Sequence, residues 1–111
     1  MSTVVNLRDE RQGRDRRALD AEVRDDGSLV IRGQDLGPGA SSMSGDDEEY
    51  EWAYTFAAQD VPKLVAALGG TPDQPTIELL QQRYTGASSY ELEHIVRTTE
   101  DTIPREFWNW G

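Results

Sequence analysis

The residues with the clearest chemical potential are five acids in the stretch GDDEEYEW, namely Asp46, Asp47, Glu48, Glu49 and Glu51. Carboxylates at this density could hold calcium or contact a basic partner. Calcium loops alternate their ligands in a D-x-D-x-D-G ladder, which this stretch lacks. Consecutive side chains on an extended chain also point in opposite directions, so they do not converge on one ion. We therefore predict no bound metal and interpret the five acids as a surface for a basic protein partner.

A second candidate centre is His94, the only histidine, which follows Glu91 in the pattern E-x-x-H. Carboxylate-bridged metal sites use that spacing, but they need two such motifs and further glutamates from other helices. The carboxylate pair of a glycosidase needs a deep cleft, which a single core of this size rarely encloses. The sequence also contains no G-x-S-x-G elbow and no glycine-rich phosphate loop. We therefore predict that the protein is not an enzyme and has no cofactor.

A third group with binding potential is the aromatic segment EFWNWG, residues 106–111. If this segment is a strand, Trp108 and Trp110 lie on one face and Phe107 on the other, so they cannot all face the core. Exposed tryptophans are typical of protein–protein interfaces. Trp108 and Trp110 are therefore predicted to be aromatic anchors for a partner.

Charge is distributed unevenly along the chain, whose formal net charge is −10. Residues 1–17 hold five Arg and three acids, whereas residues 18–111 hold six bases and eighteen acids, a net charge of −12. An acidic surface repels the phosphates of nucleic acids and anionic membranes, and it attracts basic proteins. Solubility alone is the alternative explanation for the same charge.

The length of 111 residues fits one domain. The chain has no cysteine, which excludes disulfides and thiolate metal sites and is compatible with a reducing cytosol. No stretch approaches the roughly 20 apolar residues of a membrane span, and the N-terminus lacks the apolar region of a secretory signal. We therefore expect a cytoplasmic protein that binds neither membranes nor nucleic acid directly.

The elements that must position these residues begin after a basic N-terminal arm. Residues 1–17 show no apolar period, which predicts a flexible arm. Residues 18–33 predict a β-hairpin closed by a three-residue loop, with Val23 opposite Leu29 and Ala21 opposite Ile31. Residues 33–49, rich in Gly, Ser and acids, are expected to form a long loop.

The second half of the chain predicts one more strand and then helices. Strict alternation of aromatic residues over 50–56 predicts a strand whose rings pack the core. Helices are expected to begin near Asp60, Pro75 and Ser88, and the C-terminal tail is a candidate edge strand. Because strands precede helices, residues 18–111 predict a single α+β domain, an antiparallel sheet with about three helices packed on one face.

Four segments carry a resemblance to a group of known proteins: VIRGQDLG, the acid run before the aromatic strand, DVPKLVAALGG and IPREFWNW. Together they span residues 18–110, and they resemble small acidic proteins encoded in high-GC actinobacterial genomes. Some of those proteins are similar to immunity proteins of polymorphic toxin systems. The resemblance implies an inhibitor of a toxin, and it brings no residue-level motif with it.

The hypothesis that unites these observations is a protein-binding module, an immunity-type inhibitor that docks its acidic loop onto a basic partner such as a toxin. Three alternatives remain open. A nucleic-acid mimic would need carboxylates spaced like phosphates across a face. A structural or assembly protein could add its C-terminal tail as a strand to a partner. A small enzyme would need a deep pocket near His94.

Overall fold

The computed structural model describes residues 2–13, 15–36 and 49–110, which form one antiparallel sheet and three α-helices. The sheet has the order β1-β2-β3-β4-β5, so each strand pairs with its neighbours in the sequence. Its strands are β1 (Thr3–Gln12), β2 (Asp15–Val23), β3 (Leu29–Leu36), β4 (Glu49–Phe56) and β5 (Glu106–Trp110). The helices are α2 (Val61–Ala67), α3 (Thr76–Arg83) and α4 (Ser89–Thr98), with short 3-10 turns at Ala58–Asp60 and Gly86–Ser88. The predicted α+β class is therefore confirmed.

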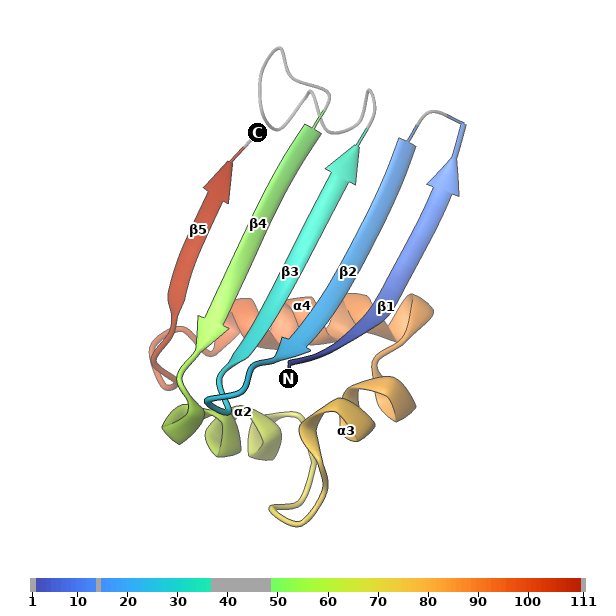
Figure 1. Ribbon diagram of the computed structural model, residues 1–111. Helices are drawn as coiled ribbons and strands as arrows, with labels where there is room; N and C mark the ends of the chain where they lie inside the picture. Colours follow the sequence, from blue (N-terminus) through green and yellow to red (C-terminus); the bar gives the residue numbers. More distant parts are fainter. Residues whose placement is uncertain (1, 14, 37–48, 111) are drawn as a thin grey trace.

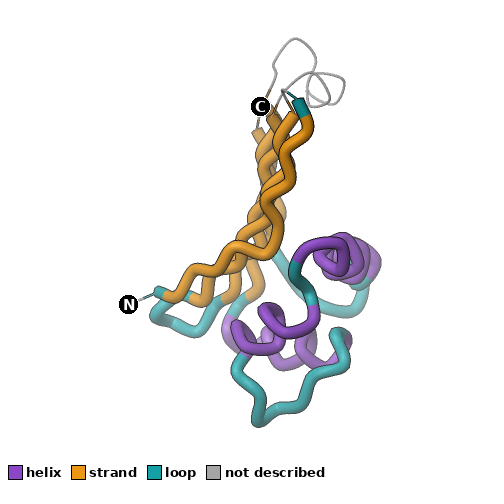
Figure 2. Tube along the Cα trace, turned by 90° about the vertical axis from the view of Figure 1, so that its right-hand side faces the viewer, coloured by secondary structure: helices purple, strands orange, loops and turns teal. Residues whose placement is uncertain are grey.

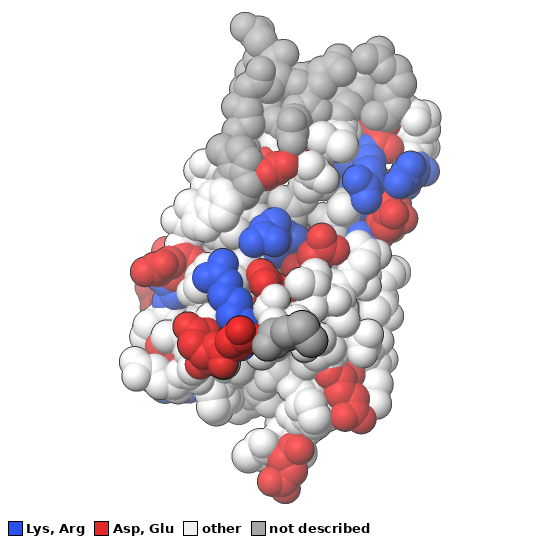
Figure 3. Space-filling model, in the orientation of Figure 1, with Lys and Arg blue, Asp and Glu red and all other residues white. Residues whose placement is uncertain are grey.

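All three helices lie on one side of the sheet, near one end of the strands (Figure 1; Figure 2). The other end of the sheet extends beyond the helices, as the edge-on view shows (Figure 2). In an antiparallel pair, residues directly opposite each other point to the same face. Trp52 is stacked near Arg97 of α4, so its face is the helix side. The residues that alternate with it lie on the open face, which Figure 3 shows.

The prediction of a flexible N-terminal arm over residues 1–17 is wrong. Residues 3–12 form β1, which pairs with β2 along its whole length. Leu7 is only 2% exposed and belongs to the core. The strand was hidden in the sequence because a register shift between Asn6 and Arg8 breaks the alternation, so no regular apolar period survives.

The predicted hairpin over residues 18–33 is confirmed, with its register. Val23 pairs with Leu29, and Ala21 with Ile31. The loop residue Gly27 has φ 87°, and its N–H donates to the Arg24 carbonyl over 2.9 Å. Glycine adopts this left-handed conformation without a steric cost, so it fixes the three-residue loop.

Strand β3 continues to Leu36, so the expected loop begins later than residue 33. Its remaining residues, 37–48, lie outside the described part of the chain. Within β3, Gly33 pairs with Trp52, and a Cβ at this glycine would lie 2.2 Å from the indole ring. The absence of a side chain at Gly33 therefore makes room for Trp52 in the core.

The aromatic strand β4 packs as predicted. Trp52 is 4% exposed and Phe56 is fully buried, while Tyr50 and Tyr54 are half-buried against the core. Apolar side chains of α2, α3 and α4 belong to the same core cluster as Trp52 and Phe56. Among the described residues, no helix is long and apolar enough to cross a membrane.

The helices begin close to the predicted positions, but neither Asp60 nor Ser88 caps its helix through its side chain. Asp60 precedes α2, yet its carboxylate accepts a hydrogen bond from Lys63 over 3.0 Å and makes no side-chain cap bond. Ser88 precedes α4, and its hydroxyl donates to the Thr85 carbonyl over 2.8 Å. Both residues lie at the position of a cap without making its characteristic hydrogen bond.

Candidate binding surface

The register of β4 and β5 brings together residues that the sequence separates by more than fifty positions. Glu51 pairs with Trp110, and Ala53 pairs with Trp108. Glu49 is the first residue of β4, opposite Leu36. Four of the seven predicted partner-binding residues therefore lie on adjacent strands at one margin of the sheet. The other three, Asp46, Asp47 and Glu48, lie outside the described residues, as do the side chains of Glu49 and Trp110.

The Glu51 side chain has a local partner within the sheet. It is half-buried and accepts a hydrogen bond from the Gln34 side-chain amide over 2.7 Å. Gln34 lies directly opposite on β3, so this is a cross-strand pair on the open face. Glu51 therefore contributes a side-chain hydrogen bond between β3 and β4, in addition to any contact with a partner.

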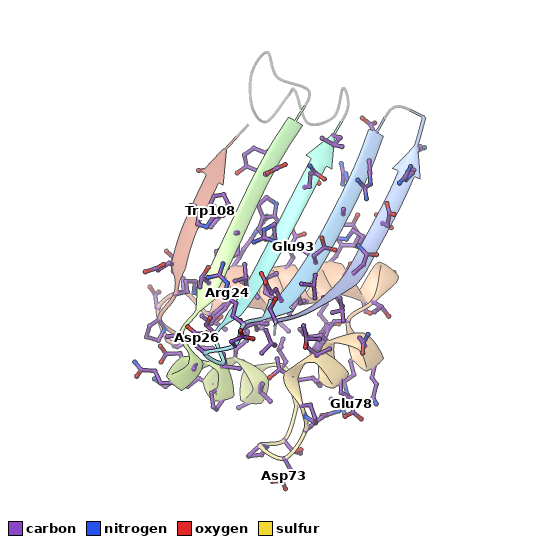
Figure 4. The ribbon with its side chains drawn as sticks, in the orientation of Figure 1. Arg24, Asp26, Asp73, Glu78, Glu93 and Trp108 are labelled. Atoms are coloured by element: carbon purple, nitrogen blue, oxygen red, sulfur yellow. The ribbon has the colours of Figure 1, made fainter. Side chains whose placement is uncertain are left out.

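Trp108 and Phe107 lie on opposite faces of β5 and are both exposed. Trp108 keeps 44% of its surface accessible and Phe107 keeps 50%. Trp108 lies on the open face at the margin of the sheet (Figure 4). Phe107 lies on the helix side, where its ring is 4.7 Å from that of Tyr54. An edge strand with exposed aromatic rings on both faces is a surface typical of interfaces.

The start of β5 is fixed by Arg105, which joins it to the end of α4. The guanidinium donates to the Val96 carbonyl, to Thr99 Oγ1 over 2.9 Å and to the Ile103 carbonyl over 3.1 Å. It also lies 5.0 Å from the centroid of the Phe56 ring. Burial lowers the pKa of this guanidinium. The position of β5 relative to α4 is therefore set by a network of polar contacts.

An open groove of about 640 Å³ lies on the helix side of the sheet, beside the start of β5. Its walls are formed by Tyr54, Glu100, Pro104, Arg105 and Phe107. Glu100 and Glu106 are exposed at this margin, and Glu106 alternates with Phe107 onto the open face. On the open face, Figure 3 shows uncharged atoms along part of the β5 side, whereas blue and red atoms mix over the strands toward β1.

A buried polar cluster ties β1 to α4. Arg8, which is 3% exposed, donates from Nε to Ser89 Oγ and from Nη1 to Glu93 Oε1, each over 2.8 Å. The Tyr90 ring lies 3.6 Å from the Arg8 guanidinium carbon, and its hydroxyl donates to Glu10. Glu93 also pairs with Arg97 at 3.2 Å. These contacts attach β1 to α4, and they explain why residues 3–12 form a strand of the sheet.

Asp35 lies near this cluster on the helix side of β3, opposite Arg17. Burial raises the pKa of its carboxyl, and the nearby Glu93 carboxylate raises it further, while Arg17 and Arg8 oppose that shift. The ionised form of the Asp35 carboxyl is therefore less favoured in the folded protein than in water.

His94 and Glu91, the E-x-x-H pair, are both exposed on α4. Within the described ranges 2–13, 15–36 and 49–110, no group of three or more His, Asp or Glu side chains is arranged to hold a metal ion.

Several residues of the surface escaped sequence reasoning, above all Phe107, Glu100 and Tyr54. The alternation in EFWNWG indicated that one aromatic set would be exposed, and in fact both faces of β5 carry an exposed ring. Glu100 follows α4 in a charged turn, and only the path of the chain brings it beside β5. No local pattern marks such a residue.

Comparison of the chain with protein-family models, with curated proteins and with solved structures finds no match. The surface must therefore be interpreted from its own geometry.

Proposed function

We propose that the protein is a protein-binding module, an immunity-type inhibitor that covers a basic surface of a toxin. The observation that supports the proposal is the register of β4 and β5, in which Glu51 pairs with Trp110 and Ala53 pairs with Trp108. In the sequence, the other predicted acids, residues 46–49, come directly before Tyr50 and Glu51. Acidic residues beside exposed aromatic rings provide both electrostatic steering and a desolvated anchor.

Two further observations support a basic partner. The net charge of −10 favours fast association with a cationic surface and disfavours contact with nucleic acid. Toxins that act on nucleic acids need basic active sites, because they must bind phosphates. An acidic segment that enters such a site would inhibit it by occupying the position of the phosphates.

The test is co-expression with the product of the neighbouring gene in a bacterial host, with survival and complex formation as the two measurements. We expect the wild-type protein to restore growth and to purify with that product. Replacing the five acids 46–49 and 51 by Asn and Gln is expected to abolish both effects.

A matched control separates the position of these acids from the total charge. Its five substitutions fall on acids away from this margin, Asp20, Asp25, Asp73, Glu78 and Glu91, and they change the net charge by the same amount. We expect this variant to protect as well as the wild type. Loss of protection in both variants would mean that charge alone acts, and full protection by the first variant would refute the role of the acids.

A further inference from the structure

We propose that the outer edge of β5 accepts an extended segment of a basic partner protein as an additional antiparallel or parallel strand of the sheet. The inference rests on the protein-binding function proposed above and specifies its mode. Strand addition gives affinity through main-chain hydrogen bonds and specificity through alternate side chains.

The first argument is the state of the β5 edge. β5 is the terminal strand of the sheet, and no described strand pairs with its outer side. Its pairing with β4 runs without a register shift from Glu106 to Trp110. Proteins usually block such an edge with a bulge, a proline within the strand or lysine side chains, and β5 has none of these.

The second argument is that the side chains on both faces of an added strand would contact residues at or beside β5. A side chain on the helix side would enter the groove lined by the Phe107 ring, the Glu100 carboxylate and Arg105. The Arg105 guanidinium already donates to Val96, Thr99 and Ile103, whereas Glu100 is exposed. Side chains on the open face would lie beside Trp108 and Glu106. A long basic side chain fits each row, because its aliphatic stem can cover the ring while its charge reaches the acid.

Charge decides between a basic partner and a second copy of this chain. Two copies would each bring a net charge of −10 to the contact, together with Glu100 and Glu106 at each edge. Like charges opposed across an interface are unfavourable. A segment rich in Lys or Arg and in β-branched residues instead complements both the acids and the pleated edge.

The third argument is that β5 is already held in its extended conformation. Arg105 joins the start of the strand to α4 through three acceptors, and β4 pairs with its inner side. A rigid edge has little conformational freedom left to lose on binding, which lowers the entropic cost of association.

The experiment uses the full-length protein and three synthetic peptides. The probe is an eight-residue peptide of alternating Lys and Val. One comparison peptide alternates Glu and Val, and the other is the Lys-Val peptide with methylated backbone nitrogens. At saturation, we expect the Lys-Val peptide to slow amide hydrogen exchange at least tenfold at those residues of 107–110 whose N–H points away from β4, and neither comparison peptide to do so.

Two variants locate the contact. Trp108→Lys and Phe107→Lys place a cation on the edge, and each is expected to weaken binding of the Lys-Val peptide at least tenfold. The matched control is Val4→Lys on the opposite edge strand β1, where Val4 is 56% exposed. It adds the same charge to another edge and is expected to leave the affinity within twofold of the wild type.

Other results would overturn the inference. Equal binding of the methylated peptide would show that charge alone is recognised, and protection at β1 would place the contact on the wrong edge. A mass that doubles with concentration, with β5 amides protected in the absence of peptide, would assign the edge to a second copy. If the two Lys variants at residues 107 and 108 still neutralise the co-expressed toxin, the proposed function stands and strand addition is refuted.

Discussion

The two edge strands of the sheet, β1 and β5, differ in how readily their outer sides could pair with a further strand. β1 contains a register shift and charges of both signs, and its Arg8 is buried against α4. β5 is regular, and its exposed side chains include Phe107 and Trp108. The first arrangement is typical of an edge that is protected from pairing, and the second of an edge that is kept open for it. The two edges therefore differ in structure, although the strands follow one another in the sheet in their sequence order.

The largest expected effect comes from removing the cation that attaches β1. Arg8→Met would leave Ser89 and the half-buried Glu93 without their main partner, and breaking one side of a buried ion pair costs about 3–5 kcal/mol. We expect the free energy of unfolding in urea to fall toward the lower end of that range, because Arg97 remains beside Glu93. Arg11→Met, at a side chain that is 70% exposed, is the control and is expected to change stability by less than about 0.5 kcal/mol.

A second substitution tests the packing of Gly33 against Trp52 within the sheet. Gly33→Ala would place a methyl group within 2.2 Å of the Trp52 ring, which is 4% exposed and has little room to move. Overpacking of this kind costs about 1–3 kcal/mol, and we expect the upper part of that range. The double variant Gly33→Ala/Trp52→Leu is expected to lose less stability than the two single variants combined. Strict additivity of their unfolding free energies would show that the contact does not matter.

A third substitution tests whether β5 is held by Arg105. Arg105→Met removes the hydrogen bonds to the Val96 and Ile103 carbonyls and to Thr99, at about 1 kcal/mol of net stability for each bond. We expect a loss of about 1–3 kcal/mol on that basis. Amide exchange is the sharper measurement: the β5 amides are expected to exchange faster relative to those of β1. An equal change at both edges would contradict the idea that the two are attached independently.

The smallest expected effect comes from Asp35, whose ionised carboxyl is disfavoured in the folded state. The folded state raises the pKa of Asp35, so between its ordinary pKa and the raised value the folded protein binds more protons than the unfolded chain. Stability from this carboxyl is therefore present below its ordinary pKa and is lost as pH rises through the raised value. Asp35→Asn is expected to increase stability at pH 7 by less than about 1 kcal/mol, with a smaller gain at pH 3. A gain that is independent of pH would exclude titration of Asp35 as its cause.

The sequence predicted those elements in which apolar or aromatic residues alternate regularly along a short segment. The register of the β2–β3 hairpin followed from apolar alternation and Gly27, and the burial of β4 followed from its aromatic alternation. The fold class followed from the order of these elements. Local rules were sufficient because each of these elements pairs with its neighbour in the chain.

β1 was not predicted from the sequence, because it lacks the regular alternation that marks the other strands. Its register shift interrupts the alternation near Leu7, and its charged residues resemble those of a solvated arm. The partners that justify its arginine, Ser89 and Glu93, lie in α4, where no short-range pattern can reveal them. The groove beside β5 was hidden in the same way, because Glu100 reaches it only through the path of the folded chain.

The contacts of Arg8 also have a consequence for how the molecule folds. They join residues that are 81 and 85 positions apart, whereas every strand pair from β1 to β4 is formed between neighbouring segments. The entropy of closing so long a loop must be lost before the contacts form, so long-range contacts of this kind slow folding. We therefore expect the meander of β2, β3 and β4 to form early and the docking of α4 onto β1 to complete the native state. Because these contacts join the first and second halves of the chain, we expect the two halves to unfold as one cooperative unit, and we expect removal of β1 to destabilise the whole fold.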